Sequence, residues 1–416
     1  MTGAGTSGIV VDEVPRGYRR PEPLQAAFLQ AASSLRQTDG WLNPVSDERE
    51  LVADLALEGG GVKGIALVGA VLVLDEAGYR FRAVAGTSAG AIAACLIAAI
   101  TQSGQPMTKL KELMDSMQFS NFMPEGHLHR FLDHDGGKVG SLVADAAILS
   151  HRMGIYSGDY LAEWLTPKLA DLGVRTFEDL RLPDDDPGRS LPDGHDYRLV
   201  VHTSDITRAQ LVRLPWDCPL YGWDPGEMDV VGAVRASMSI PFFFEPVTFT
   251  AKRADVGLPA PDGHRVIQHY EGGTVTWVDG GMLRNFPIQA FDRIDGNPPR
   301  WPTIGIKLSS LTTEFPPTEA CQHAMAEAVR CLRTMMNEWD SYAVDASTAG
   351  RTIFVDNGGL TATDFNLTTD QQAMLFLNGV EAATRFVIEM AEQRGVPRTG
   401  ADAAALIRRR WAADSA

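Results

Sequence analysis

The chain has 416 residues, of which 44% are hydrophobic and 22% are charged. This balance fits a folded globular protein and excludes disorder along the whole chain and a coiled coil, and the length suits one large α/β domain with insertions or two ordinary domains. The net charge of −16 excludes broad binding to nucleic acid, which needs a basic surface, and argues against docking to anionic lipid through charge alone.

The sequence carries no evident targeting signal, membrane span or metal-binding cysteine pattern. The N-terminal residues lack the apolar core of a signal peptide. The longest apolar stretch, near Ala89–Ile100, is shorter than the roughly 18 residues that span a bilayer. The four cysteines are scattered without metal-ligand spacing. We therefore expect a soluble, cytoplasmic protein with reduced thiols, and an export route without a cleaved signal stays open.

The first recognisable elements are a strand, a helix, a strand and a helix between residues 54 and 100. LALEGGG predicts a short buried strand that ends in glycines, and the apolar segment 63–78 predicts a helix. FRAVAG predicts a second strand, and the small apolar residues 88–100 predict a buried helix. This order implies a mostly parallel central sheet covered by helices on both faces, an α/β fold.

The rest of the chain predicts further elements of the same domain. Strands are expected at 197–203, 210–214, 275–278 and 303–308, and helices at 24–35, 157–173, 230–238, 318–343 and 369–394. Two stretches are interpreted as insertions, 102–156 without a clear period and 251–272 as a polar hairpin. Because no linker is evident after residue 50, we expect one domain over 51–395, an N-terminal extension over 1–50 and a C-terminal tail over 396–416.

The segment GTSAG at 86–90 matches G-x-S-x-G. It lies between a predicted strand and a predicted apolar helix, which is where a nucleophile elbow requires it. Ser88 would be the nucleophile, because the following helix points its first amides at that position and favours negative charge there. The elbow residues around it would be Gly86, Thr87, Ala89 and Gly90. A glycine-rich packing turn is the alternative interpretation.

A second glycine motif, GGGVKG, follows the first predicted strand. It also satisfies the dinucleotide pattern G-x-G-x-x-G, but no acidic residue follows at the end of the second strand to hold a ribose. A Walker loop is excluded because Gly64, not Ser or Thr, follows Lys63. We interpret the motif as an oxyanion hole, since consecutive glycines let several N–H groups converge on one oxygen. Its residues are Gly59, Gly60, Gly61, Val62, Lys63 and Gly64.

The serine needs a base, and the sequence offers two kinds. Asp279, Gly280 and Gly281 follow a predicted strand, although a lone D-G-G is often only a turn. His202, at the end of another predicted strand, is the best histidine for a catalytic triad.

Four other histidines have weaker interpretations. His127, His129 and His134 form a cluster whose spacing matches no metal-ligand pattern. His323 follows Asp279 in the chain but lies on a predicted helix, where packing is the simpler role. We expect no metal and no other cofactor.

Taken in order, GGGVKG, GTSAG and DGG resemble the motifs of the patatin-like phospholipase family. The segments SMSIPFFFEPV (237–247), NFPI (285–288) and LNGVEAATRF (377–386) also fit that family, so the resemblance covers residues 51–392. It implies a patatin-like three-layer α/β/α fold. The departures are mild: Glu58 stands where an Asp often precedes the glycines, and Lys63 stands where Arg is common.

The resemblance also implies a mechanism. Ser88 would be the nucleophile, Asp279 would accept its proton without a histidine, and residues 59–64 would supply the oxyanion donors. The reaction would be hydrolysis of fatty-acyl esters of a lipid or phospholipid, of the phospholipase A or lysophospholipase type, through an acyl-enzyme. A free Asp is a weak base for a hydroxyl, so burial beside Ser88 would have to raise its pKa.

Several alternatives remain. An acyltransferase would use the same acyl-enzyme with another acceptor, and a non-catalytic module would keep the fold to bind lipid or protein. The Met- and Phe-rich stretch 113–131 is either a lipid-facing lid or core packing. Transient contact with a membrane surface and a protein activator stay open, as do the head group and the position of the ester.

Overall fold

The computed structural model describes residues 20–42, 49–122, 153–183, 195–259, 265–293, 301–308, 346–360 and 366–393, with a few isolated residues between 327 and 364. Most of the predicted helix at 318–343 lies outside these residues, and the isolated residues described within it, between 327 and 335, are helical. The predicted tail at 396–416 and most of the insertion at 102–156 also lie outside them. No helix in the described ranges is both long enough and apolar enough to cross a bilayer.

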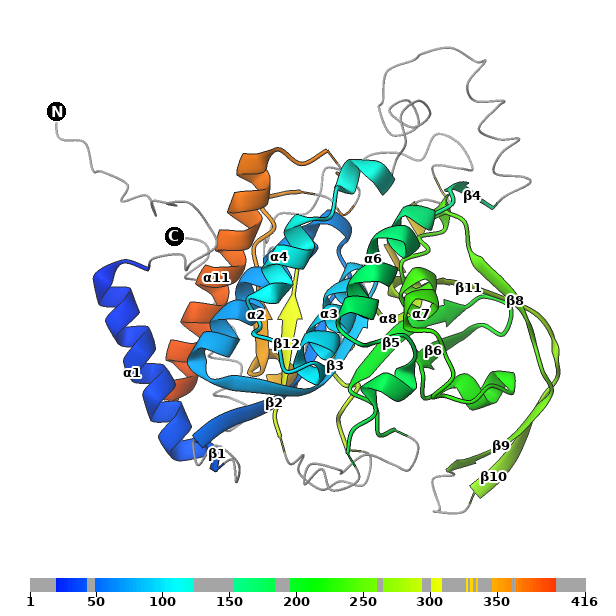
Figure 1. Ribbon diagram of the computed structural model, residues 1–416, viewed down its shortest axis with the longest axis horizontal. Helices are drawn as coiled ribbons and strands as arrows, with labels where there is room; N and C mark the ends of the chain where they lie inside the picture. The colour runs from blue at the N-terminus through cyan, green and yellow to red at the C-terminus, as the bar shows by residue number, and fades with distance from the viewer. Residues whose placement is uncertain are drawn as a thin grey trace, which may run out of the picture.

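A central sheet organises the chain (Figure 1) and runs in the order β13-β12-β2-β3-β5-β11-β8. Its strands are β2 (Arg49–Leu57), β3 (Tyr79–Thr87), β5 (Leu199–Asp205), β8 (Val247–Ala251), β11 (Gly273–Asp279), β12 (Thr303–Lys307) and β13 (Thr352–Phe354), with β1 (Trp41–Leu42) beside β2 and β6 (Gln210–Leu214) beside β5. Neighbours from β13 to β5 are parallel, whereas β11 is antiparallel to β5 and to β8. The α/β fold predicted from the sequence is confirmed. The central sheet is mixed, because β1, β6, β8 and β11 pair antiparallel, and this antiparallel part was not predicted.

One face of this sheet is covered by helices that sequence periods had predicted, except for the short helix Lys109–Asp115, which lies in the stretch interpreted as an insertion and was not predicted. The main ones are α2 (Ile65–Ala77), α3 (Ala89–Gln102), α4 (Lys109–Asp115), α6 (Asp159–Asp171), α7 (Val230–Ser237) and α11 (Thr369–Glu392). Because β2, β3 and β5 follow one another in the same direction across the sheet, their right-handed crossovers place α2 and α3 on one face. Helix α11 packs on α2, and α1 (Glu22–Asp39) packs on α11. The helix α1 thus buries part of the predicted N-terminal extension in the main core.

The opposite face of the sheet carries a smaller apolar cluster. Side chains alternate along a strand, so Ala56 of β2 points away from the main core that its neighbours Leu55 and Leu57 enter. Phe286 and Ile288 pack against it there. The segment that follows β11 therefore covers this face, and the fold has the three layers expected of an α/β/α protein.

The shorter elements complete the path of the chain. They are η1 (Gly61–Gly64), η2 (Phe119–Phe122), β4 (Gly154–Tyr156), η3 (Phe177–Leu180), η4 (Cys218–Tyr221), β7 (Phe242–Phe244), α8 (Gly281–Arg284) and α10 (Ala346–Ala349). Within the Met- and Phe-rich stretch 113–131, Met114, Met117 and Phe122 are buried in the main core. This favours core packing over a lipid-facing lid for the part of that stretch that the structure describes.

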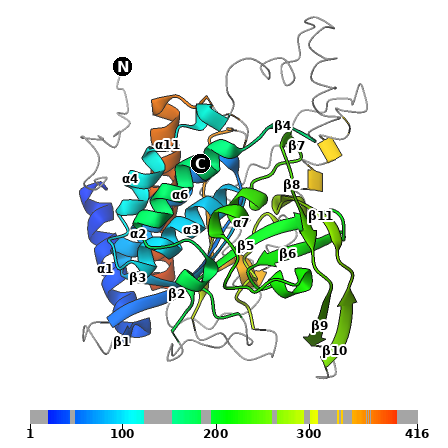
Figure 2. The same cartoon turned by 45° about the vertical axis from the view of Figure 1, so that its right-hand side comes forward.

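The predicted hairpin at 251–272 is confirmed. Strands β9 (Ala254–Pro259) and β10 (Arg265–Tyr270) pair only with each other and extend away from the central sheet (Figure 2). Along the chain, the hairpin follows β8 and precedes β11. Val266 and Ile267 are more than half exposed on it.

Candidate active site

Strand β5 brings Ser88 and Asp279 to one place in the sheet. Thr87, at the end of β3, lies opposite His202 of β5. Asp279, at the end of β11, lies opposite Thr203, the next residue of β5. The two strand ends therefore meet at the same level, although β3 is parallel to β5 and β11 is antiparallel to it. Because Ser88 follows Thr87 directly, this register places it beside Asp279.

Ser88 occupies a sharp turn between β3 and α3. Its φ of 53° and ψ of −125° belong to a strained region that few residues other than glycine adopt. A Cβ added to Gly86 would lie 2.3 Å from the carbonyl oxygen of Gly90, and a Cβ added to Gly90 would lie 2.3 Å from that of Leu57. The turn therefore requires glycine at both positions and presents Ser88 at the N-terminus of α3.

Ser237, the last residue of α7, supports the turn. The Ser88 N–H donates to Ser237 Oγ at 2.9 Å, and Ser237 Oγ donates to the His202 carbonyl oxygen at 2.6 Å. The next residues connect to the other side of the site, because the Gly280 N–H donates to the Ser237 carbonyl at 3.3 Å and the Asp279 N–H donates to the Ser239 carbonyl at 2.9 Å. This segment thus links the nucleophile turn to the aspartate. The sequence interpretation gave Ser237 no role.

Asp279 is fully buried. Its Oδ1 accepts a hydrogen bond of 2.7 Å from the Gly281 N–H, and its Oδ2 has no partner at hydrogen-bond geometry among the described residues. Burial raises the pKa of Asp279 to about 7, while the nearby Ser88 hydroxyl and the Gly281 N–H act to lower it. Ser88 therefore lies close enough to the carboxylate to lower its pKa without a hydrogen bond of standard geometry to Oδ2. A carboxylate with this pKa is a far better base near neutral pH than a free Asp.

The glycine motif lies between β2 and α2, beside Ser88. A Cβ added to Gly59 would lie 3.0 Å from the Ser88 Cβ, and Gly61 has a φ of +55° with no room for a Cβ beside the Ala362 carbonyl, 1.8 Å away. Within the described part of the chain, the N–H groups of Gly60 and Gly61 donate to no protein acceptor. Two consecutive free donors, in a loop whose first glycine packs against Ser88, are what an oxyanion hole needs.

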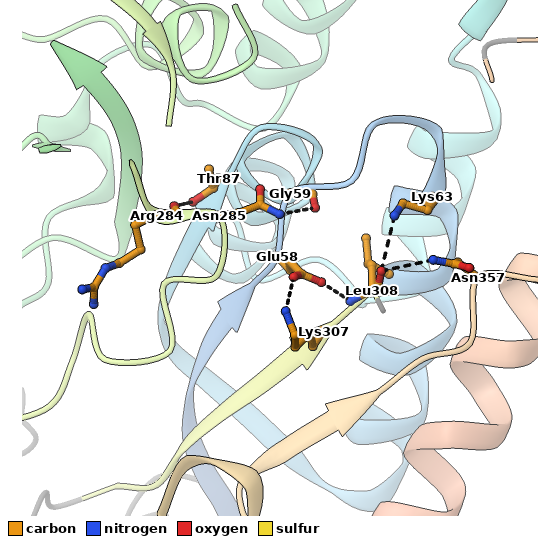
Figure 3. Close-up of polar contacts among 9 residues, drawn as sticks. All are labelled: Glu58, Gly59, Lys63, Thr87, Arg284, Asn285, Lys307, Leu308 and Asn357. Carbon is orange, nitrogen blue, oxygen red and sulfur yellow. Dashed lines mark hydrogen bonds and ion pairs between the residues drawn. The ribbon is translucent and has the colours of Figure 1, made fainter. Parts of the chain in front are cut away.

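Buried charged side chains connect the glycine loop and Glu58 to residues 307 and 308 (Figure 3). The Glu58 carboxylate accepts from the Lys307 ammonium and from the Leu308 N–H. The Lys63 ammonium donates to the Leu308 carbonyl at 3.4 Å, and the Asn357 amide donates to the same oxygen at 3.5 Å. Burial lowers the pKa of Lys63, and the Glu58 carboxylate partly opposes this. The Lys63 side chain therefore contacts β12 and supports the loop.

The segment after Asp279 is tied to both neighbouring motifs. The Asn285 amide donates to the Gly59 carbonyl at 3.0 Å, and the Gly59 N–H donates back to the Asn285 carbonyl at 3.1 Å. The Thr87 hydroxyl donates to the Arg284 carbonyl at 3.1 Å. Figure 3 shows these contacts together. The elbow, the glycine loop and the aspartate segment thus form one hydrogen-bonded unit.

His202 does not complete a triad in this structure. Register partners share a face of a sheet, so Asp279 lies on the same face as Thr203 and the His202 ring lies on the other. Burial lowers the pKa of His202 to about 3, assisted by the charges of Arg284 and Arg213. Neither ring nitrogen has a hydrogen-bond partner within the described residues. Only the backbone of His202 takes part in the site.

The other histidine interpretations stay untested. His127, His129, His134 and His323 lie outside the described residues. Among the residues that are described, no group of three or more His, Cys, Asp or Glu side chains is arranged to hold a metal ion.

Comparison with known proteins decides the family. The sequence model of the family described as patatin-like phospholipase matches residues 55–292, a span that includes Ser88 and Asp279. The chain belongs to the patatin-like phospholipase family. The match confirms the class predicted from sequence, a lipid-hydrolysing enzyme. This patatin-like chain is also 31% identical, over 334 residues, to the uncharacterized protein YqhO of Bacillus subtilis (strain 168), a match that covers 80% of this chain and 97% of YqhO.

Two solved structures are more distant. VipD from Legionella pneumophila is 17% identical with a TM-score of 0.41, and the match covers 80% of this patatin-like chain and 66% of VipD. ExoU, in its heterodimeric complex with SpcU from the type III secretion system of Pseudomonas aeruginosa, is 18% identical with a TM-score of 0.36, and the match covers 83% of this chain and 53% of that one. The chain thus spans about half the length of ExoU.

Proposed function

We propose that this patatin-like enzyme hydrolyses fatty-acyl esters of lipids, of the phospholipase A or lysophospholipase type, with Ser88 as nucleophile and Asp279 as its base. The observation that carries the proposal is the fully buried Asp279, whose pKa is raised to about 7 beside a serine in a strained turn. A buried carboxylate that served only the fold would be expected to have both oxygens hydrogen-bonded, and Asp279 Oδ2 has no such partner among the described residues.

The first half of the reaction forms an acyl-enzyme. Ser88 Oγ attacks the ester carbonyl carbon while Asp279 Oδ2 takes the hydroxyl proton, and the carbonyl oxygen becomes an oxyanion. The free N–H groups of Gly60 and Gly61 donate to that oxygen, in a buried setting where such donors act strongly. The intermediate then collapses, the bond to the leaving alcohol breaks, and the alcohol takes the proton from Asp279.

The second half releases the acid. Water attacks the acyl carbon of the ester on Ser88, Asp279 takes a proton from that water, and the same donors stabilise the second oxyanion. When the bond to Ser88 Oγ breaks, the proton returns from Asp279 to the serine, and the fatty acid leaves. The pair thus ends each cycle in its starting state. No step requires the ring of a histidine.

The test is the release of fatty acid from a panel of esters, from short-chain chromogenic esters to phospholipid vesicles, with and without a chelator. We expect the wild type to hydrolyse some of these and Ser88→Ala to lower the rate by at least about a thousandfold. Ser103→Ala is the matched control, because this exposed serine lies at the C-terminal end of the same helix and should keep full activity. Hydrolysis that survives in Ser88→Ala would refute the nucleophile.

A further inference from the structure

Asn285 is the residue through which the aspartate segment contacts the glycine loop. It follows α8 and is 9% exposed. The Asn285 side-chain N–H donates to the Gly59 carbonyl at 3.0 Å. The Asn285 backbone carbonyl accepts from the Gly59 N–H at 3.1 Å, so the two residues form a reciprocal pair of hydrogen bonds. Both polar groups of Gly59 are therefore bound to Asn285. The loop cannot rotate at this residue without breaking one of these bonds.

The bond to the Gly59 carbonyl has a consequence for the next N–H group. A peptide unit is planar and trans, so its carbonyl and N–H point in opposite directions. The Gly59 carbonyl and the Gly60 N–H belong to the same unit. When Asn285 holds the carbonyl, it also fixes the direction of the Gly60 N–H. That N–H is one of the two free donors of the glycine loop.

Close packing around Gly59 leaves little room for this peptide to move. A Cβ on Gly59 would lie 2.2 Å from Asn285 Oδ1 and 3.0 Å from the Ser88 Cβ. The Asn285 and Ser88 side chains therefore both occupy the space that a side chain on Gly59 would need. A displacement of the Asn285 amide would move the donor loop relative to the nucleophile.

Asn285 is also a costly choice for stability alone. Its Oδ1 is buried without a hydrogen-bond partner among the described residues, and an unsatisfied buried acceptor destabilises a folded protein. An apolar side chain of the same shape would avoid that penalty. The amide N–H nevertheless satisfies the buried Gly59 carbonyl, which an apolar side chain of the same shape cannot do.

We propose that Asn285 is a positioning residue for acyl transfer. It fixes the Gly59–Gly60 peptide so that the Gly60 N–H faces the developing oxyanion, and it couples that donor to the segment that carries Asp279. This role rests on the proposed function, in which Gly60 is an oxyanion donor. Asn285 itself touches neither the substrate nor the reacting atoms.

The decisive variant is Asn285→Leu, which keeps the approximate shape and removes the amide. It removes the unsatisfied oxygen and also leaves the Gly59 carbonyl without its donor, two effects of opposite sign on stability, so the variant should fold with a melting temperature near that of the wild type. Removing an oxyanion donor outright lowers kcat by about 100- to 1000-fold. Releasing the donor from its support should lower kcat on a short-chain chromogenic ester by about 10- to 100-fold with KM nearly unchanged. Asn285→Ala should lower kcat similarly.

The pH profile separates this role from an effect on the base. If Asn285 acts on the oxyanion donor, the plateau of kcat/KM falls while its midpoint stays at that of the wild type. A shifted midpoint would place the effect on Asp279 and would overturn the proposal. Asn378→Ala is the matched control, because Asn378 also donates to a backbone carbonyl, that of Asp356 at 3.0 Å, and should leave kcat unchanged.

Two kinds of failure can be told apart. An enzyme whose hydrolysis depends on Ser88 but is unaffected by Asn285→Leu would overturn the role of Asn285 and leave the proposed function in place. A folded wild type without Ser88-dependent hydrolysis of any ester in the panel would overturn both.

Discussion

Replacing Asp279 by Asn should abolish activity and stabilise the protein at the same time. The pKa of Asp279 is raised from 3.8 to about 7 by burial, a shift of about 3 units that corresponds to about 4 kcal/mol. Because the native state binds this proton more tightly than the unfolded chain, the ionised carboxylate destabilises the fold. The stability that this group contributes is complete below about pH 4 and is lost as the pH rises through about 7. An amide carries no such penalty.

The effect can be measured by urea unfolding of wild type and Asp279→Asn at two pH values. The variant should be more stable by up to about 4 kcal/mol at pH 8 and by about 2 kcal/mol at pH 5, where the wild-type carboxylate is mostly protonated in the native state. Asp205→Asn is a matched control on β5, because the buried Asp205 carboxylate accepts from the Thr207 and Arg208 N–H groups and from the Tyr221 hydroxyl. That variant should lose stability at pH 8. An equal gain for Asp279→Asn at both pH values would refute the reasoning.

The same pKa fixes the pH dependence of the reaction. Asp279 must be ionised to accept a proton, so kcat/KM of the wild type should rise to a plateau with a midpoint near pH 7. At pH 5 it should be roughly one-hundredth of the plateau value. Asp279→Asn should lower kcat/KM by several orders of magnitude across this range. An activity independent of pH between 5 and 8 would contradict the assignment of this base.

Three other changes test the surroundings of the pair. Ser237→Ala leaves the buried Ser88 N–H without an acceptor, so urea unfolding should show a loss of about 1–3 kcal/mol and ester hydrolysis should slow; an unchanged kcat would argue that the elbow needs no such support. His202→Phe should leave the pH midpoint of kcat/KM in place, because the ring lies on the other face of the sheet, and a lost or shifted midpoint would revive the triad. Gly61→Ala should lower both the melting temperature and kcat, because its Cβ would meet the Ala362 carbonyl; wild-type behaviour would show that the loop relaxes without consequence.

Local patterns in the sequence were sufficient for the first strand–helix–strand–helix unit of the fold, although not for β13 of the same parallel region. The apolar strand ends at 55–61 and 81–86, and the small-residue helix after Ser88, are short-range signals that predicted β2, β3, α2 and α3. The nucleophile turn could be predicted for the same reason, since the steric need for Gly86 and Gly90 is set within a few residues.

What could not be predicted depends on distant pairing. That Thr203 and Asp279 are register partners is a property of two strands more than seventy residues apart, and no local period specifies it. The contacts of Ser237 with Ser88 and of Asn285 with Gly59 also join segments far apart in the chain. Without the family resemblance, D-G-G would have remained an ordinary turn, because the burial that makes Asp279 a base exists only in the folded sheet.

The β9–β10 hairpin suggests where this scaffold tolerates change. Strands β8 and β11 are already paired at Ala251 and Gly273, so the chain leaves and re-enters the sheet at neighbouring positions. Whatever connects these two residues, the alignment of β11 on β5 stays the same. Replacement of 253–271 by a short turn, or by a foreign recognition loop, should therefore leave the catalytic geometry intact. The hairpin is therefore a suitable position for grafting a new loop.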